Sequence, residues 1–246
     1  MPAQPQSTWI EVVNVVARSV GHPTTTDVAS STDEVILRLG EYANFSCTEL
    51  QLEFDWEALN KFGQIDVVAD APQQVEKAFP LPADYVRLVD NTLWNRSTQL
   101  PAVGPVNPQD WQWLVVRKAF ITFRFMWRIR LGQLWVKSPP ETMQPLTFEY
   151  QSNLWAVDGV TDTPKTIMSN NSDFHILDPY AVILKTRLKW LEQEGYDTTA
   201  TKRDFDVAIQ AIFGGDRGAG TLSLVPGGGY PYINSLGNLP DTGYGI

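Results

Sequence analysis

Hydrophobic positions near the start of the sequence recur every three or four residues, which is the spacing of a helix with one buried face. Within residues 8–20, this spacing is followed by Trp9, Val12, Val13, Val16 and Val20. We therefore expect an amphipathic helix that ends at the sequence Gly-His-Pro (21–23).

A second periodic run predicts a longer helix. Its apolar positions extend from Ile36 to Phe54, and the pattern continues to about Lys61. Ser31 and Glu34 have the spacing of a capping box, in which each side chain bonds the other residue's backbone. We expect a helix of more than 25 residues that needs neighbouring helices to cover its apolar stripe.

Beyond Gly63 the period changes to two, which is typical of half-buried strands. Alternation is clearest in residues 121–130 (ITFRFMWRIR), and shorter strands are predicted at 134–137 and 146–151. Between the helices and these strands, Asn107 and Pro108 form a helix start, with Asn as the cap and Pro in the first turn. A short helix is expected near 108–117.

The helical period returns near the end of the sequence. Asp178 and Pro179 predict a second cap-plus-proline start, for a helix closed by Gly195. Another helix is expected from Thr199 to the glycine pair at 214–215. The remaining residues are rich in glycine but contain the apolar clusters LSLV, YPYINSL and YGI.

These elements predict an α+β fold. In it, an antiparallel helical bundle is formed by the N- and C-terminal helices (1–62 and 176–213). A small antiparallel β lobe (63–175), which includes the short helix near 108–117, is inserted between them. An extended glycine-rich C-terminal tail (214–246) completes the chain.

Composition narrows the class of protein. With 43% hydrophobic and 19% charged residues over 246 positions, the chain is expected to be globular. The net charge of −9 disfavours a general nucleic-acid binder, although an acidic surface suits a wall past which DNA slides without sticking. Cys47 is the single cysteine and is interpreted as a buried apolar side chain. Neither a membrane span nor a signal peptide is indicated, so a protein folded in a cytosol is expected.

The sequence offers little for catalysis. His22 and His175 lie in polar, turn-like contexts and are interpreted as loop or surface residues. No metal-binding motif occurs, and the glycines of the tail lack the lysine of a phosphate-binding loop. We therefore predict no catalytic, cofactor-binding or metal-binding residue, and no enzymatic activity.

Three arginines occupy one face of the strongest predicted strand. Arg124, Arg128 and Arg130 alternate with its apolar positions. One interpretation is contact with an acidic partner or a neighbouring subunit. The interpretation we favour is cross-strand pairing with Glu149 or other acids.

A family resemblance rests on residues 79–111. The runs FPLPADY (79–85), RLVD (87–90), LWNR (93–96), PAVGP (101–105) and NPQDW (107–111) follow one another and lead into the predicted strands. This pattern resembles the head-to-tail adaptor proteins of tailed bacteriophages, also called connector or tail accessory proteins, especially those of short-tailed phages. The likeness covers roughly residues 8–214.

The resemblance implies a structural virion protein without enzymatic activity. Such adaptors form rings, commonly of twelve identical subunits, beneath the portal protein. They bind downstream tail proteins of the nozzle or tail tube, and DNA passes through their channel without specific binding. The neck of the virion, assembled in the host cytoplasm, is the implied location.

The C-terminal segments of such adaptors extend onto the portal. The apolar tail residues of this chain are therefore predicted to bind the portal; they are Leu222, Leu224, Val225, Tyr230, Tyr232, Ile233, Leu236, Tyr244 and Ile246.

The alternative is a receptor- or carbohydrate-binding tail module, because the sequence has nine tryptophans and sugar sites use exposed aromatic platforms. Against it, Trp127 falls on the apolar face of its predicted strand. We expect the tryptophans of residues 79–114 to fix the β lobe to the helical bundle instead.

Overall fold

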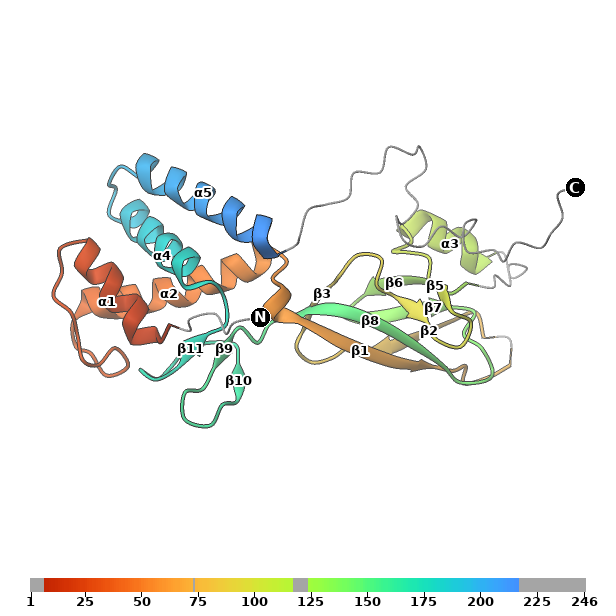
Figure 1. The fold of residues 1–246 in the computed structure, drawn as a ribbon. Coiled ribbons are helices and arrows are strands. Elements are labelled where there is room, and N and C mark those ends of the chain that lie inside the picture. Colours follow the sequence, from red (N-terminus) through yellow and green to blue (C-terminus); the bar gives the residue numbers. More distant parts are fainter. Residues whose placement is uncertain (1–6, 73, 117–123, 217–246) are drawn as a thin grey trace, which may run out of the picture.

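The computed structural model describes residues 7–72, 74–116 and 124–216, and the structural statements below concern these residues. Figure 1 shows two parts side by side along the length of the molecule, a helical part and a β part. The helices are α1 (Trp9–Ser19), α2 (Glu34–Glu53), α3 (Pro108–Val116), α4 (Pro179–Gln193) and α5 (Thr199–Asp216), with a 3₁₀ turn, η1 (Glu57–Leu59).

The strands pair in three antiparallel sheets. They are β1 (Asn60–Val67), β2 (Glu76–Pro80), β3 (Tyr85–Leu88), β4 (Trp94–Asn95), β5 (Leu100–Pro101), β6 (Met126–Arg130), β7 (Gln133–Lys137), β8 (Gln144–Ser152), β9 (Ala156–Val157), β10 (Pro164–Lys165) and β11 (Phe174–His175). The largest sheet has the order β1-β8-β4-β5, with β3 also paired to β8. The other two have the orders β2-β7-β6 and β10-β9-β11.

The two larger sheets enclose one core. Their inward side chains, among them Val67, Phe79, Trp127, Leu134 and Phe148, form a single buried cluster. Gly63 on β1 lies opposite Phe148, and a Cβ there would stand 2.6 Å from the Phe148 ring. The glycine is therefore needed for close cross-strand packing, which explains why it does not end the element.

A second core lies between the helices and the small β10-β9-β11 sheet. Buried residues of α1, α2, α4 and α5 pack there together with Trp155, Ala156, Met168 and Leu177, which come from the region of this sheet. Figure 1 places the small sheet next to α1 and α2, on the side away from α5.

The predicted architecture is therefore wrong, although the α+β class is compatible with the structure. The described residues form five helices and three antiparallel sheets rather than a helical bundle with one small β lobe. The third sheet was missed because strands of two residues, such as Ala156–Val157, are too short to show alternation. Its residues join the core that the prediction assigned to helices alone.

The helix boundaries differ from the predicted ones in two places. The N-cap of α2 is Asp33, whose side chain accepts from Val35 N, so the predicted capping box at Ser31 is wrong. The helix also ends at Glu53 instead of near Lys61, because the backbone becomes extended at Phe54. By contrast, Asp178 caps α4 with Pro179 in the first turn, as predicted.

Candidate functional site

The segment 79–114 contains residues 79–111, on which the family resemblance rests, and contributes several elements of the β part. It supplies the end of β2, then β3, β4 and β5, and then α3. Two of its tryptophans, Trp94 and Trp111, make contacts within the β part, where the prediction expected contacts with the helical part. Trp111 donates to the Glu76 carboxylate (2.7 Å), and Trp94 pairs with Thr147 of β8, so both make these contacts inside the β part.

Arg87 of β3 makes the contact between the two parts. Its guanidinium donates to the carbonyl oxygens of Leu52 (2.7 Å) and Phe54 (2.5 Å), at the C-terminal end of α2. It also pairs with the Asp55 carboxylate at 2.7 Å. The last turn of α2 contains no basic residue of its own. A cation is favourable at a helix C-terminus, and here the β part supplies it.

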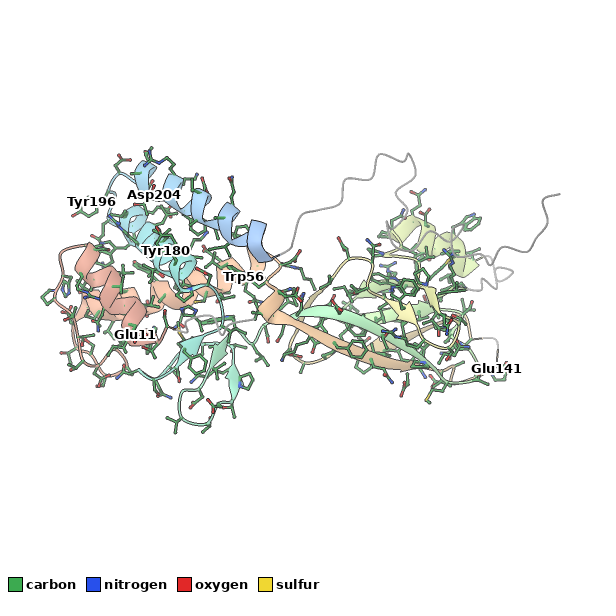
Figure 2. All side chains as sticks on the ribbon, viewed as in Figure 1. Glu11, Trp56, Glu141, Tyr180, Tyr196 and Asp204 are labelled. Carbon is green, nitrogen blue, oxygen red and sulfur yellow. The ribbon has the colours of Figure 1, made fainter. Side chains whose placement is uncertain are left out.

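Buried amides complete this joint. The Gln151 amide, fully buried on β8, donates to the Trp56 carbonyl (2.9 Å), and the buried Gln51 amide of α2 donates to the Ser152 carbonyl (3.3 Å). The Trp56 indole donates to Leu50 O at 2.8 Å. Figure 2 shows Trp56 where the helical part meets the β part. Because buried polar groups lose free energy when unpaired, these bonds fix the orientation of the two parts.

Asp84, in the LPAD run before β3, ties three strands together. Its carboxylate accepts from Lys61 Nζ (2.7 Å), Ser152 Oγ (2.8 Å) and the Tyr150 hydroxyl (2.9 Å). Burial alone would raise the pKa of Asp84, but these hydrogen bonds outweigh it and lower the pKa to about 2. Burial and the bond to Asp84 raise the pKa of Tyr150 to about 12. Both groups keep one protonation state at neutral pH, which suits a structural tie.

A groove lies beside the joint, and we call it the seam groove. It consists of two adjoining hollows of about 390 and 240 Å³ that share Leu88, Asp90, Pro105 and Trp127. Residues of β3, of β6 and of the segment 104–108 line it. Gly104 packs directly on Trp127, since a Cβ there would stand 2.5 Å from the Trp127 carbonyl oxygen.

The predicted arginine face is located in part on β6. The Arg128 guanidinium stacks over the Trp111 ring at 5.6 Å, and that of Arg130 over the Trp135 ring at 5.5 Å. Glu149 lies on β8, in a different sheet, so it is not their cross-strand neighbour as we had expected. Arg124 is exposed and lies just before β6. The stacking leaves Arg128 and Arg130 charged at the surface of the β part.

An apolar stripe runs along the outer face of α2, and sequence reasoning missed it. Leu37, Phe45 and Leu52 lie on one side of the helix, with 42%, 56% and 55% of their surfaces exposed. The spacing of eight and seven residues places them within one face of a 3.6-residue period. Exposed Glu41 and Thr48 lie between them, so the stripe consists of three separate large apolar side chains rather than one continuous patch. Large exposed apolar side chains aligned on one helix face suit a protein–protein interface.

Other predicted residues have clear positions. Cys47 is fully buried as expected, and burial raises the pKa of its thiol. His175 is also fully buried, so its assignment to the surface is wrong. Burial lowers the pKa of His175 to about 4, despite its bond to Leu177 O. The nine predicted portal-binding residues of the tail lie outside the described residues.

The tryptophans offer little platform for a sugar. Trp111, Trp127 and Trp155 are buried, while Trp113 of α3 is 47% exposed. Across the described residues, no group of three His, Cys, Asp or Glu side chains lies close enough to hold a metal ion. None of the described helices combines the length and hydropathy that crossing a membrane requires.

No family model matches the sequence, and no curated protein matches it either.

Proposed function

We propose that this chain is a structural subunit of a tailed-phage virion, a head-to-tail adaptor that forms a ring beneath the portal protein. The observation that carries the proposal is the apolar stripe of Leu37, Phe45 and Leu52 on α2. If the subunit buries this face against an identical copy, these apolar side chains stabilise the contact, although they are exposed in the isolated chain. The resemblance of residues 79–111 to adaptor proteins supplies the class of assembly.

The joint supports the same proposal. A ring closes only if every subunit presents its two contact faces at one fixed angle. Arg87, Gln151 and Gln51 connect the helical part to the β part through bonds at 2.7, 2.9 and 3.3 Å. This arrangement favours a subunit that enters a ring as one body.

The proposed ring binds the portal on one side and downstream tail proteins on the other, and the adaptors that residues 79–111 resemble commonly form rings of about twelve copies. DNA passes through its channel without specific binding. The net charge of −9 supports a wall that does not hold phosphates. In this proposal the protein resides in the virion neck after assembly in the host cytoplasm.

Electron microscopy of the protein mixed with the portal protein encoded in the same genome tests the proposal. We expect rings stacked on the portal. Phe45→Glu should abolish them while leaving circular dichroism unchanged, because it places a charge in the buried subunit contact. Val160→Glu, a matched change at an 80% exposed valine, should assemble normally. Failure of the unmodified chain to bind the portal would reject the adaptor function, and normal rings of Phe45→Glu would reject the α2 contact.

A further inference from the structure

The seam groove is lined by residues of two strands, β3 and β6, that lie at sheet edges. β6 is the last strand of its sheet, and β3 pairs with β8 alone among the described strands. Tyr85 and Leu88 of β3 line the groove, as do Trp127 and Ile129 of β6. An open strand edge is a template for another extended segment, which adds by backbone hydrogen bonds.

The hydrogen bonds of β6 show which groups point into the groove. Trp127 N donates to Val103 O (3.0 Å), and Trp127 O accepts from Val106 N (2.9 Å), so both backbone groups of Trp127 point away from β7. In antiparallel pairing this direction alternates from one residue to the next. The N–H and C=O of Ile129, two residues later, therefore point to the same side as those of Trp127. Ile129 lies beyond the part of β6 that pairs with 103–106, because the chain enters α3 at Pro108.

We propose that residues 221–225 (TLSLV) of the same chain dock in the seam groove as a short added strand that pairs with β6 at Ile129. This segment alternates, with Leu222 and Leu224 on one side and Thr221, Ser223 and Val225 on the other. Such a pattern is typical of a half-buried strand. The groove wall supplies the apolar side chains of Leu88 and Ile129 for one face.

The position of the segment in the chain fits this site. α5 ends at Asp216, and Figure 1 shows its C-terminal end directed toward the β part. Residues 221–225 follow five to nine positions later, a reach of up to about 17 to 32 Å in an extended chain. The docked segment thus lies early in the tail.

The charges of the groove favour an uncharged occupant. Arg87 is engaged by Asp55 and the end of α2, and the Arg128 guanidinium is stacked on Trp111. The segment TLSLV carries no charge, so it brings no ion of its own into the groove, which Asp90 already lines. Trp127 lines both hollows, but its indole N–H is buried beside Gly104 and has no hydrogen-bond partner among the described residues.

This proposal assigns Leu222, Leu224 and Val225 to the chain's own β part rather than to the portal. The later tail residues, from Tyr230 onward, are left for an external partner. It does not depend on the adaptor function, because it concerns the purified chain alone. Its tests contain no portal, so they fail or succeed separately from the assembly experiment.

Amide hydrogen exchange of the full chain is the first test. We expect Leu222→Asp/Leu224→Asp to raise the exchange rate of the Ile129 amide at least tenfold, because a charged segment leaves the groove and exposes that N–H. Leu236→Asp, the matched change later in the tail, should leave Ile129 unaffected. Equal exchange at Ile129 in the unmodified chain and the double variant would overturn the proposal.

Disulfide trapping tests the position directly. In a Cys47→Ala background, Ile129→Cys is combined in turn with a cysteine at 222, 223 and 224, and oxidation is carried out in dilute solution. We expect one pairing to close a bond within a single chain, detected by peptide mass. Met143→Cys, at a 62% exposed site elsewhere in the β part, should not react with the same positions. Equal trapping at 129 and 143, or dimers in place of the intrachain bond, would overturn the assignment.

Discussion

Arg87 and Asp55 form an ion pair at 2.7 Å that connects β3 to the residues just after α2. The same guanidinium closes the end of α2 through the carbonyl oxygens of Leu52 and Phe54. One side chain thus joins a strand of the β part to a helix more than thirty residues earlier in the sequence. The family-like segment acts here as a structural connection rather than as a ligand site.

Arg87→Ala should destabilise the protein by about 1.5 to 3 kcal/mol, because it removes charged hydrogen bonds to two carbonyl groups and an ion pair. Urea unfolding measures the change. The stability of Arg87→Lys should lie between that of the unmodified protein and that of Arg87→Ala, because one ammonium group cannot reproduce the planar geometry of a guanidinium with three acceptors. Small-angle scattering should show a broader distribution of overall dimensions for Arg87→Ala.

The control for Arg87 is Arg203→Ala. Arg203 is exposed on α5 and pairs with its neighbour Asp204 at 3.3 Å, so its removal should change the free energy of unfolding by less than about 0.5 kcal/mol. Equal stability of Arg87→Ala and Arg203→Ala would contradict the role of Arg87 at the joint.

His175 should make the protein less stable as pH falls from about 6.5 to about 4. Burial lowers its pKa to about 4 in the folded state, against an ordinary value of 6.5. Between these values the unfolded chain binds the extra proton, so acid favours unfolding. The contribution lost over this interval is roughly 3 kcal/mol. Urea unfolding at half-unit pH steps measures it.

His175→Asn tests the assignment, because its amide can still donate to Leu177 O but does not titrate. Between pH 4 and 6.5, the slope of unfolding free energy against pH should correspond to about one proton fewer in this variant than in the unmodified protein. His22→Asn, at the other histidine, serves as the matched control. An unchanged slope in His175→Asn would show that other groups cause the acid sensitivity.

Loss of the Asp84 contribution also makes the protein less stable as pH falls, but in a lower pH range than that of His175. The pKa of Asp84 is lowered from 3.8 to about 2, so its contribution to stability is complete above about pH 4 and disappears as pH falls toward 2. Asp84→Asn should therefore cost about 2 kcal/mol at pH 7 and little at pH 2. Chemical unfolding at the two pH values separates these cases.

Asp70→Asn is the comparison for Asp84, since Asp70 also pairs with a lysine, Lys77, but its side chain is 70% exposed. We expect a change of less than 1 kcal/mol there. A loss at Asp84 that did not depend on pH would indicate altered packing instead of a lost charge.

Local signals predicted the parts of the fold that neighbouring residues determine. The cap at Asp178 and the alternation in 134–137 and 146–151 led to α4, β7 and β8. The failures lie where distant contacts decide. The small sheet through the buried His175 consists of two-residue strands, and Thr8, far away in the sequence, forms a bridge to Phe174.

The candidate site was partly visible in the sequence. The sequence singled out the segment 79–111 but did not predict that Arg87 connects the β part to α2. The acceptors of Arg87 lie between Leu52 and Asp55, far from it in the sequence. One signal was available: α2 has no basic residue in its last turn, so a cation from elsewhere was to be expected. The apolar stripe through Phe45 was not predicted, because the periodic apolar positions of α2 indicate its buried face and do not indicate which further apolar residues stay exposed.

Gly104 is one of the residues that line the seam groove, and it packs against Trp127 of β6. A Cβ at this position would meet the Trp127 carbonyl oxygen at 2.5 Å and the indole nitrogen at 2.9 Å. Since the nearest atom belongs to the backbone, 103–106 must move away from β6, and its bonds with Trp127 weaken. Gly104→Ala should therefore cost about 1 to 3 kcal/mol.

Tryptophan fluorescence and urea unfolding of Gly104→Ala measure this effect together. We expect a shift in emission, because Trp127 loses its packing partner, and a lower midpoint of unfolding. Thr98→Ala, an exposed substitution in the same segment, should leave both unchanged. If Gly104→Ala unfolds at the same urea concentration as Thr98→Ala, then 103–106 tolerates displacement, and the β6 edge is more open than its hydrogen bonds indicate.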